Sequence, residues 1–304
     1  MSFENPITIR EAIENIDKKD YLLPAIQREF VWKHEQIESL FDSLMRGYPI
    51  GSFLFWKVEG DKKNEFKFYE FIRNYTQYKR KGSHNPEAKI IGDGPIISIL
   101  DGQQRLTALD IGLRGSYAYK IPYRRIGNSD SYPPRQLYLD LLNKSDKVDM
   151  EYNFRFLTEK EVEELNKNGV WFLVGEILNF SDLKDLLKYI DNLETDVDKF
   201  KLVDPLSDLF QVINKEQIIN YYLEKGEELD KVLNIFIRVN SGGTTLSYSD
   251  LLLSTAIAQW SKKDARKVIL EFVDTINDIG DGFEFDKDFV LKSCLVLINL
   301  KNIA

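Results

Sequence analysis

The chain has 304 residues, of which 43% are hydrophobic and 30% are charged, so it can bury a core and fill one large or two smaller globular domains. Its formal net charge of −8 argues against a protein that binds nucleic acid over its whole surface, although a local basic patch stays compatible with that balance. The sequence has no low-complexity tract and no internal repeat.

Cysteine and histidine are scarce. Cys294 is the only cysteine, which excludes a disulfide within the chain and fits a reducing cytoplasm, where we expect the protein to act. Its apolar neighbours predict a buried structural thiol. His34 and His84 are the only histidines, so neither a Cys/His zinc site nor a histidine-based nuclease centre is expected. No apolar run reaches the length of about 18 residues that a membrane helix needs, and we expect no contact with a membrane.

The first elements alternate between helix and strand. A capping box at Thr8–Glu11 predicts a helix that continues to about Lys18. A second helix is predicted over His34–Arg46, and Gly47 follows it as a typical stop. The run Ser52–Val58 is apolar at successive positions, which predicts a central strand buried on both faces.

A polar, lysine-rich stretch follows from Glu59 to Gly94. Within it, Tyr75–Pro86 interleaves tyrosines with Lys and Arg. This pattern fits a solvated loop, and it also fits an insertion that stacks on nucleic acid bases and contacts phosphates. We expect His84, among Gly, Ser, Asn and Pro, to be a surface residue and not a ligand.

The polar cluster Asp101–Arg105 lies between an apolar run and a helical pattern, so a strand is expected to pass directly into a helix there. At a helix N-terminus the first backbone N–H groups lack partners and favour an anion. Gly102 permits a positive φ or a close ligand approach, and Arg105 offers a planar fork suited to phosphate. The cluster therefore predicts a phosphate site.

The rest of the chain is expected to change from strands to helices near residue 157. A second capping box, Thr158–Glu161, marks the change, and the last helical pattern has no stop signal, so we expect the protein to continue past Ala304. We predict an α+β protein with an α/β domain over residues 1–157 and an all-helical domain over 158–304. The expected strands are 116–120, 136–140 and 152–156, and the expected helices are 181–190, 197–212, 215–223, 230–237, 248–260, 265–279 and 286–300.

One stretch interrupts the helices, from Arg238 through Asn240 to Gly242 and Gly243. A Gly-Gly pair between helices is compatible with a simple connection. A nest of backbone N–H groups at such a pair also holds anions in other proteins, so a ligand site is the alternative.

Read together, four motifs resemble the N-terminal, GmrS-like domain of GmrSD modification-dependent restriction proteins, a family of the ParB/sulfiredoxin-like superfamily. The motifs occur in family order over residues 23 to 250. They are Leu23-Pro24-Ala25-Ile26-Gln27-Arg28-Glu29-Phe30-Val31-Trp32; Gly47-Tyr48-Pro49-Ile50-Gly51 with Trp56; Asp101-Gly102-Gln103-Gln104-Arg105-Leu106-Thr107-Ala108-Leu109; and Phe236-Ile237-Arg238-Val239-Asn240-Ser241-Gly242-Gly243 with Leu246 and Asp250.

The resemblance implies a ParB/sulfiredoxin-like fold that binds and hydrolyses a nucleoside triphosphate with Mg²⁺, and uses this step to gate cleavage of DNA, often modified DNA. It implies DNA and a His-Asn-His-type nuclease domain or subunit as partners. Such a nuclease needs histidine, yet no histidine follows His84, so we expect that this domain was removed, is supplied by a separate chain, or was never present. The oligomeric state is open, and a homo-oligomer is compatible with the sequence.

The site residues carry expected roles, each beside a structural alternative. Asp101 holds Mg²⁺ or positions water, or else caps the following helix. Gln103 and Gln104 orient water or contact base or sugar. Arg105 clamps phosphate, or forms a structural ion pair. The remaining nucleotide-binding candidates are Gln27, Arg28 (with the same alternatives as Arg105), Gly51 and Gly102, with Arg238, Asn240 and Gly242 closing the site from the helical domain.

Three other functions stay open at this stage. A nucleotide-gated DNA-binding module would bind nucleotide without turnover. A direct endonuclease would depend on Asp101, although the low histidine count and acidic charge speak against it. A phosphotransfer role is the weakest alternative.

Overall fold

The structure is a computed structural model that describes residues 2–27, 29–60, 63, 66–78, 84–90, 94–125, 128–226, 229–240, 253, 260, 264–280, 283 and 285–297. Its elements are β1 (Ser2–Phe3), α1 (Ile9–Asp17), β2 (Tyr21–Pro24), α2 (His34–Met45), β3 (Phe53–Val58), β4 (Phe68–Tyr69), β5 (Asn74–Thr76), β6 (Ile96–Asp101), α3 (Gln103–Arg114), β7 (Ser116–Ala118), η2 (Ser129–Ser131), β8 (Pro134–Lys144), β9 (Tyr152–Leu157), α4 (Glu159–Leu165), β10 (Trp171–Leu173), η3 (Val174–Asn179), α5 (Leu183–Asn192), α6 (Phe200–Asn214), β11 (Tyr221–Glu224), α7 (Leu229–Asn240), α9 (Ala265–Asn277) and α10 (Lys287–Leu297). The predicted α+β class is confirmed.

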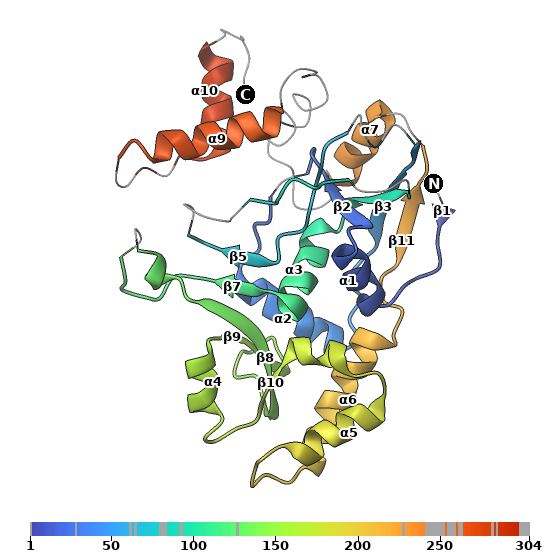
Figure 1. Cartoon of the computed structure of the whole chain (residues 1–304), viewed down its shortest axis with the longest axis vertical. Coiled ribbons are helices and arrows are strands. Elements are labelled where there is room, and N and C mark those ends of the chain that lie inside the picture. The colour runs from blue at the N-terminus through green and yellow to red at the C-terminus, as the bar shows by residue number, and fades with distance from the viewer. Residues whose placement is uncertain are drawn as a thin grey trace.

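A mixed six-stranded sheet lies at the centre of the molecule, in the order β1-β11-β3-β6-β2-β4 (Figure 1). Strand β6 pairs antiparallel with β3 and parallel with β2, and β11 pairs parallel with β3. The register places Leu54 opposite Asp101, next to an irregularity between Leu54 and Phe55. Strand β6 is therefore an internal strand of the sheet, and its last residue, where the polar cluster begins, still pairs with β3.

Strand β3 is buried on both faces, as its continuous apolar run predicts. Phe53 and Phe55 face a core that α1, α2 and α3 share. Leu54 and Trp56 face the opposite core, which α7 covers with Val232 and Phe236. Alternate side chains of one strand thus fill two separate cores, so the sheet is a middle layer between helices.

A second sheet has the order β10-β8-β7-β5, and β9 also pairs with β8. Helix α2 is joined to this sheet by two buried carboxylates. Asp42 Oδ1 accepts hydrogen bonds at 2.8 Å from the backbone N–H groups of Glu151 and Tyr152, and Glu38 Oε1 accepts one at 3.1 Å from Phe156. These charge-assisted bonds fix α2 between the sheets.

Two capping boxes predicted from sequence are present, at Thr8 and at Thr158. The helix predicted over 215–223 is wrong, because α6 ends at Asn214 and β11 follows at Tyr221–Glu224. Local apolar spacing fits either structure there, and pairing with β3 decides the outcome. Of the helix predicted over 248–260, only Leu253 and Trp260 lie within the described residues.

Packing is continuous across residue 157. Strand β11 lies between β1 and β3, and α6 contacts α1. The division into domains at this residue remains a prediction. None of the described helices has the length and apolar character needed to span a bilayer.

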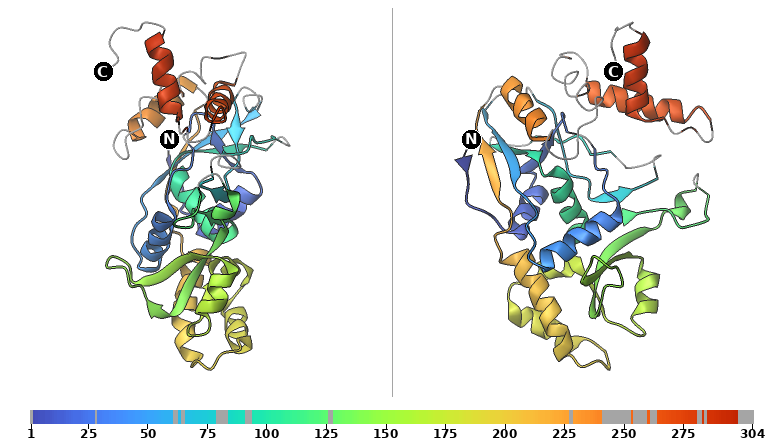
Figure 2. Two further views of the ribbon diagram at one scale, coloured as in Figure 1. Left: turned by 90° about the vertical axis from the view of Figure 1, so that its left-hand side faces the viewer. Right: turned by 180° about the vertical axis from the view of Figure 1, so that it is seen from behind.

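Helices α9 and α10 form a pair that stands beside the sheet body in all views (Figures 1 and 2). The start of α9 contacts β4, where Asp264 Oδ2 lies 2.9 Å from Lys67 Nζ and the Arg266 guanidinium stacks 4.4 Å from the Tyr69 ring centre. In α10, Cys294 is exposed, so the prediction of a buried thiol is wrong. The described neighbours of α10 cover its early turns and leave Cys294 open.

Candidate functional site

The predicted strand-to-helix transition is present, and Gly102 is the residue between the strand and the helix. Strand β6 ends at Asp101, Gly102 is the N-cap with a φ of +90°, and α3 begins at Gln103. A Cβ atom on Gly102 would lie 2.1 Å from the Phe53 ring, so glycine is needed for the backbone angle and for packing. The N-cap is Gly102 and not Asp101, so the alternative role expected for Asp101, as the N-cap of this helix, is wrong.

Arg105 holds a neighbouring turn. Its Nη1 donates to the carbonyl of Ile50, and its Nη2 donates to the carbonyl of Ser52 at 2.9 Å and to Asp101 Oδ2 at 3.3 Å. The guanidinium also lies 4.4 Å from the centre of the Phe53 ring. Burial lowers the pKa of Arg105, and the Asp101 carboxylate opposes that shift. In this structure the fork is therefore occupied by protein oxygens.

Two glutamines tie the segment after β2 to the same junction. Gln27 is buried, and its Nε2 donates to two β6 carbonyls at 2.6 and 3.1 Å. Gln104 donates through Nε2 to the carbonyl of Glu29 and accepts through Oε1 from the N–H of Val31, each at 3.0 Å. Both amides are thus paired with backbone, as burial requires.

Asp101 is the most accessible polar group of the cluster. About a third of its side chain is exposed (34%), and its Oδ2 pairs with Arg105. Gln103 is buried at the start of α3. Among the described residues no group of three or more His, Cys, Asp or Glu could hold a metal ion. A single carboxylate nevertheless suits Mg²⁺, which proteins often hold by one or two carboxylates together with substrate phosphates.

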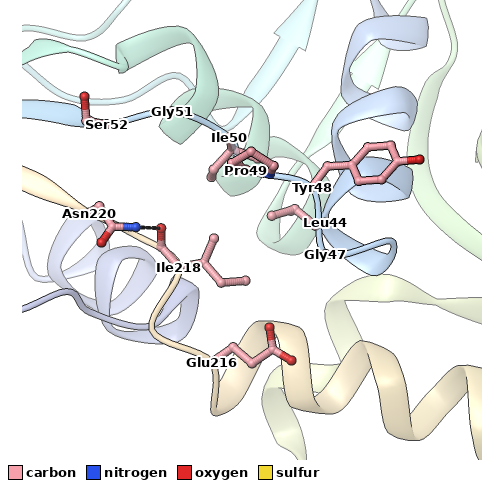
Figure 3. Close-up of a pocket in the computed structure, with 10 residues that line it drawn as sticks. All are labelled: Leu44, Gly47, Tyr48, Pro49, Ile50, Gly51, Ser52, Glu216, Ile218 and Asn220. Carbon is pink, nitrogen blue, oxygen red and sulfur yellow. Dashed lines mark hydrogen bonds between the residues drawn. The ribbon is translucent and has the colours of Figure 1, made fainter.

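A pocket of about 270 Å³ lies beside the turn that Arg105 holds (Figure 3). Gly51 has a φ of +79°, and a Cβ there would lie 2.8 Å from Arg105 Nη1, so the turn also depends on glycine. Of the predicted site residues only Gly51 lines this pocket, and its lining contains Glu216 but no cation, so it does not suit phosphate. The lining residues are Leu44, Gly47, Tyr48, Pro49, Ile50, Gly51, Ser52, Glu216, Ile218 and Asn220.

The structure brings together Gln27, Asp101, Gly102, Gln104 and Arg105, with Gln103 and Gly51 beside them. Arg238 lies in the last turn of α7, which contacts β6 and covers the face of the sheet opposite to α3. Arg28, Gly242 and the side chain of Asn240 lie outside the described residues. The expected closure of the site from α7 therefore stays a prediction.

Sequence reasoning missed a contact next to this junction. The His84 Nδ1 lies 2.5 Å from Glu29 Oε1, and its Nε2 lies 3.3 Å from Asp274 Oδ2 on α9. The hydrogen bond to Glu29 raises the pKa of His84 above its ordinary value, and burial opposes the shift. The partners are far apart in sequence, so no local pattern indicates the contact. Gln104 binds the backbone of Glu29, and His84 binds the Glu29 carboxylate. Glu29 and His84 therefore connect the Asp101–Arg105 cluster with α9.

Comparison with known proteins identifies a family and a relative. A family model described as "GmrSD restriction endonuclease, N-terminal domain" matches residues 9–257. A protein of Methanocaldococcus jannaschii, called "Uncharacterized protein MJ0686", is 27% identical over 259 residues, which cover 76% of this chain and 38% of that protein. The chain thus spans less than half the length of this relative.

Proposed function

The chain belongs to the family of GmrSD restriction endonuclease N-terminal domains, and from this premise we propose that it binds and hydrolyses a nucleoside triphosphate with Mg²⁺ as the switch of an anti-phage DNA restriction system. The family supports a role in a restriction system. The nucleotide chemistry and its placement at Asp101–Arg105 are the parts that we add.

The observation that carries the proposal is the β6–α3 junction. Its N-cap is Gly102, which has no side chain to cap the helix, and the Arg105 guanidinium and the one-third exposed Asp101 carboxylate lie beside it. The helix N-terminus favours phosphate, and Arg105 adds a fixed positive charge. Because the Arg105 fork holds two carbonyls of the 50–52 turn, we infer that a bound phosphate takes over one of these bonds and thereby moves the turn.

We assign the chemistry as follows. Water attacks the γ-phosphorus, the bond from that phosphorus to the β–γ bridging oxygen breaks, and the products are the diphosphate, phosphate and a proton that goes to solvent. Mg²⁺, when bound, neutralises charge on the β- and γ-phosphates. Asp101 would hold the ion, and Arg105 would stabilise the developing negative charge. We assign orientation of the water to Gln103 or Gln104, and at Gln104 the nucleotide would have to replace an existing backbone bond of the amide.

The test is phosphate release from each nucleoside triphosphate by the purified chain. Asp101→Asn and Arg105→Ala are each expected to reduce release about 100-fold, the usual effect of losing one electrostatic stabiliser. Arg105 also supports the fold, so thermal unfolding of each variant is measured in parallel. The Arg105→Lys variant keeps the positive charge but lacks the planar guanidinium fork, so it separates the two contributions. Unchanged release in folded Asp101→Asn and Arg105→Ala would overturn the site.

The occupied Arg105 fork favours one second candidate, a nucleotide-gated DNA-binding module without turnover. In that case nucleotide replaces the carbonyl contacts of Ile50 and Ser52 and changes the shape of the turn, but no phosphate is released. Equilibrium binding of a labelled nucleotide, sensitive to Arg105→Ala and without phosphate release, distinguishes this candidate from the hydrolase. In either case we assign DNA cleavage to a nuclease domain or subunit, and a plasmid-nicking assay with Mg²⁺ checks that this chain alone does not cut.

A further inference from the structure

The loop between β7 and η2 presents an aromatic ring and two cations to solvent. Pro122, Tyr123, Arg124 and Arg125 are all exposed, and Tyr123 is fully so (105% relative exposure). Tyr123 also has a φ of +66°, a left-handed angle that bulky residues rarely adopt. Such angles persist where the surrounding structure imposes them, and they are concentrated at functional sites.

The base of this loop is firmly held, so the exposure of its tip is not a sign of a loose segment. The Tyr119 ring stacks parallel on His34 at 3.9 Å, and the Arg135 guanidinium lies 3.9 Å from the same ring. The N–H of Ile121 donates to the carbonyl of Ser131 at 2.7 Å and closes the loop. An anchored base with an exposed tip is the arrangement expected of a recognition loop.

Gln77 and Tyr78, from a segment distant in sequence, lie beside the base of this loop. The Tyr78 and Tyr132 rings are 5.3 Å apart, and the N–H of Gln77 donates to the carbonyl of Ala118 at 2.9 Å. Strands β5 and β7 accordingly lie side by side, and the loop extends away from them (Figure 1). The sequence continues from Tyr78 into Lys79-Arg80-Lys81, which lie outside the described residues.

The cations of the loop are not neutralised within the described part of the chain. Neither Arg124 nor Arg125 forms an ion pair with a described residue, whereas Arg135 at the base is paired with Glu161. Asp130 in η2 is an acidic residue of the same loop. In a chain with a net charge of −8, two adjacent unpaired guanidinium groups make a local positive site that attracts a polyanion.

We propose that residues 122–125 form a nucleic-acid contact, in which Tyr123 stacks on an unpaired or unstacked base and Arg124 and Arg125 bind the flanking phosphates. Stacking on an aromatic side chain next to phosphate-binding cations is the common mode of single-strand binding. A membrane surface fits less well, because the tip offers one aromatic ring and no apolar face. The identification of the nucleic acid as DNA rests on the proposed role in restriction. The inference that the loop stacks on a base and binds phosphates rests on the exposure and charge of its residues instead.

The experiment measures binding of labelled single-stranded and duplex DNA to the full chain by fluorescence anisotropy over a range of salt concentrations. Tyr123→Ala is expected to weaken single-strand binding about tenfold and duplex binding less, while Tyr123→Phe retains both. The double variant Arg124→Ala with Arg125→Ala is expected to weaken both and to reduce the slope of log K against log salt by about 1.5. Lys184→Ala with Lys188→Ala on α5, at the lower end of the molecule in Figure 1 and away from the loop, removes the same charge and serves as control.

Equal effects of the loop and control variants would overturn the proposal. So would loss of binding to anionic lipid vesicles on the same substitutions with DNA binding intact, which would assign the loop to membranes. Phosphate release is measured on the same samples and is expected to be unchanged. A wild-type chain that binds DNA through this loop but releases no phosphate would leave the loop assignment standing and reject the hydrolase.

Discussion

The Asp101–Arg105 cluster and the 122–125 loop both offer polar side chains next to a tight backbone turn, but they use them in opposite ways. At the cluster, Gln104 and Arg105 are bonded to backbone atoms of other segments, and Gly102 packs against Phe53. At the loop, Arg124 and Arg125 have no ion-pair partner among the described residues. A ligand at the cluster must therefore replace internal contacts, which couples binding to the fold, whereas a ligand at the loop meets groups that are already available.

The largest expected effect is at Gly102. In Gly102→Ala the new methyl group meets the Phe53 ring and the backbone keeps a φ of +90°, so we expect a loss of about 3 kcal/mol or more in the free energy of unfolding. Gly47→Ala is the control, because Gly47 has a φ of +67° with nothing within 4 Å of the added atom, and about 1 kcal/mol is expected there. Urea unfolding measures both, and equal losses would show that Phe53 does not restrict the junction.

The next largest effect is at Gln104. Gln104→Leu leaves the carbonyl of Glu29 and the N–H of Val31 without their partner, and an unsatisfied buried group costs about 1–3 kcal/mol. Gln104→Glu keeps the acceptor for Val31 and loses the donor for Glu29, so its loss should be intermediate. A Gln104→Leu variant as stable as the wild type would mean that the Gln104 amide is available to a ligand. The contrast between internally bonded groups at the cluster and available groups at the loop would then be wrong.

A smaller, pH-dependent effect is expected at His84. Its partners are Glu29 and Asp274, and its folded-state pKa is raised above the ordinary value of 6.5. At a pH below the unfolded-state pKa of His84, the contact therefore contributes its full stabilisation to the docking of α9. This stabilisation is lost as the pH rises through the raised folded-state pKa. The effect is small because the side chain is partly exposed. Protection of α9 against hydrogen exchange, corrected for the pH dependence of intrinsic exchange, should fall over that range in the wild type but not in His84→Asn, and parallel protection profiles would contradict the role of His84.

The smallest expected effect is at Tyr123, and its sign is opposite. Tyr123→Gly relieves the left-handed backbone angle, so the folded state should be stabilised slightly, by less than about 1 kcal/mol after the greater freedom of glycine in the unfolded chain is counted. The same variant should lose single-strand binding as Tyr123→Ala does. Thermal unfolding checks the first point, and marked destabilisation would show that the ring packs against the protein.

Local patterns predicted the elements around the cluster well, and distant contacts explain what they missed. The capping boxes, the central strand β3 and the β6–α3 transition follow from spacing within a few residues. The strand β11 depends on pairing with β3, which lies far away in sequence. The partners of Arg105 likewise lie 53 and 55 positions away, so its type suggested a phosphate clamp and could not indicate the backbone oxygens that it binds.

The most direct measurement of the central claim is hydrogen exchange of the full chain with and without a nucleoside triphosphate and Mg²⁺, read out by peptide. We predict protection of the first turn of α3, after Gly102, together with a change of exchange in the turn at residues 47–52, because phosphate and the turn share the Arg105 fork. Arg105→Ala should abolish both changes. Nucleotide-dependent protection elsewhere in the chain, with none at these two segments, would contradict the assignment of the site.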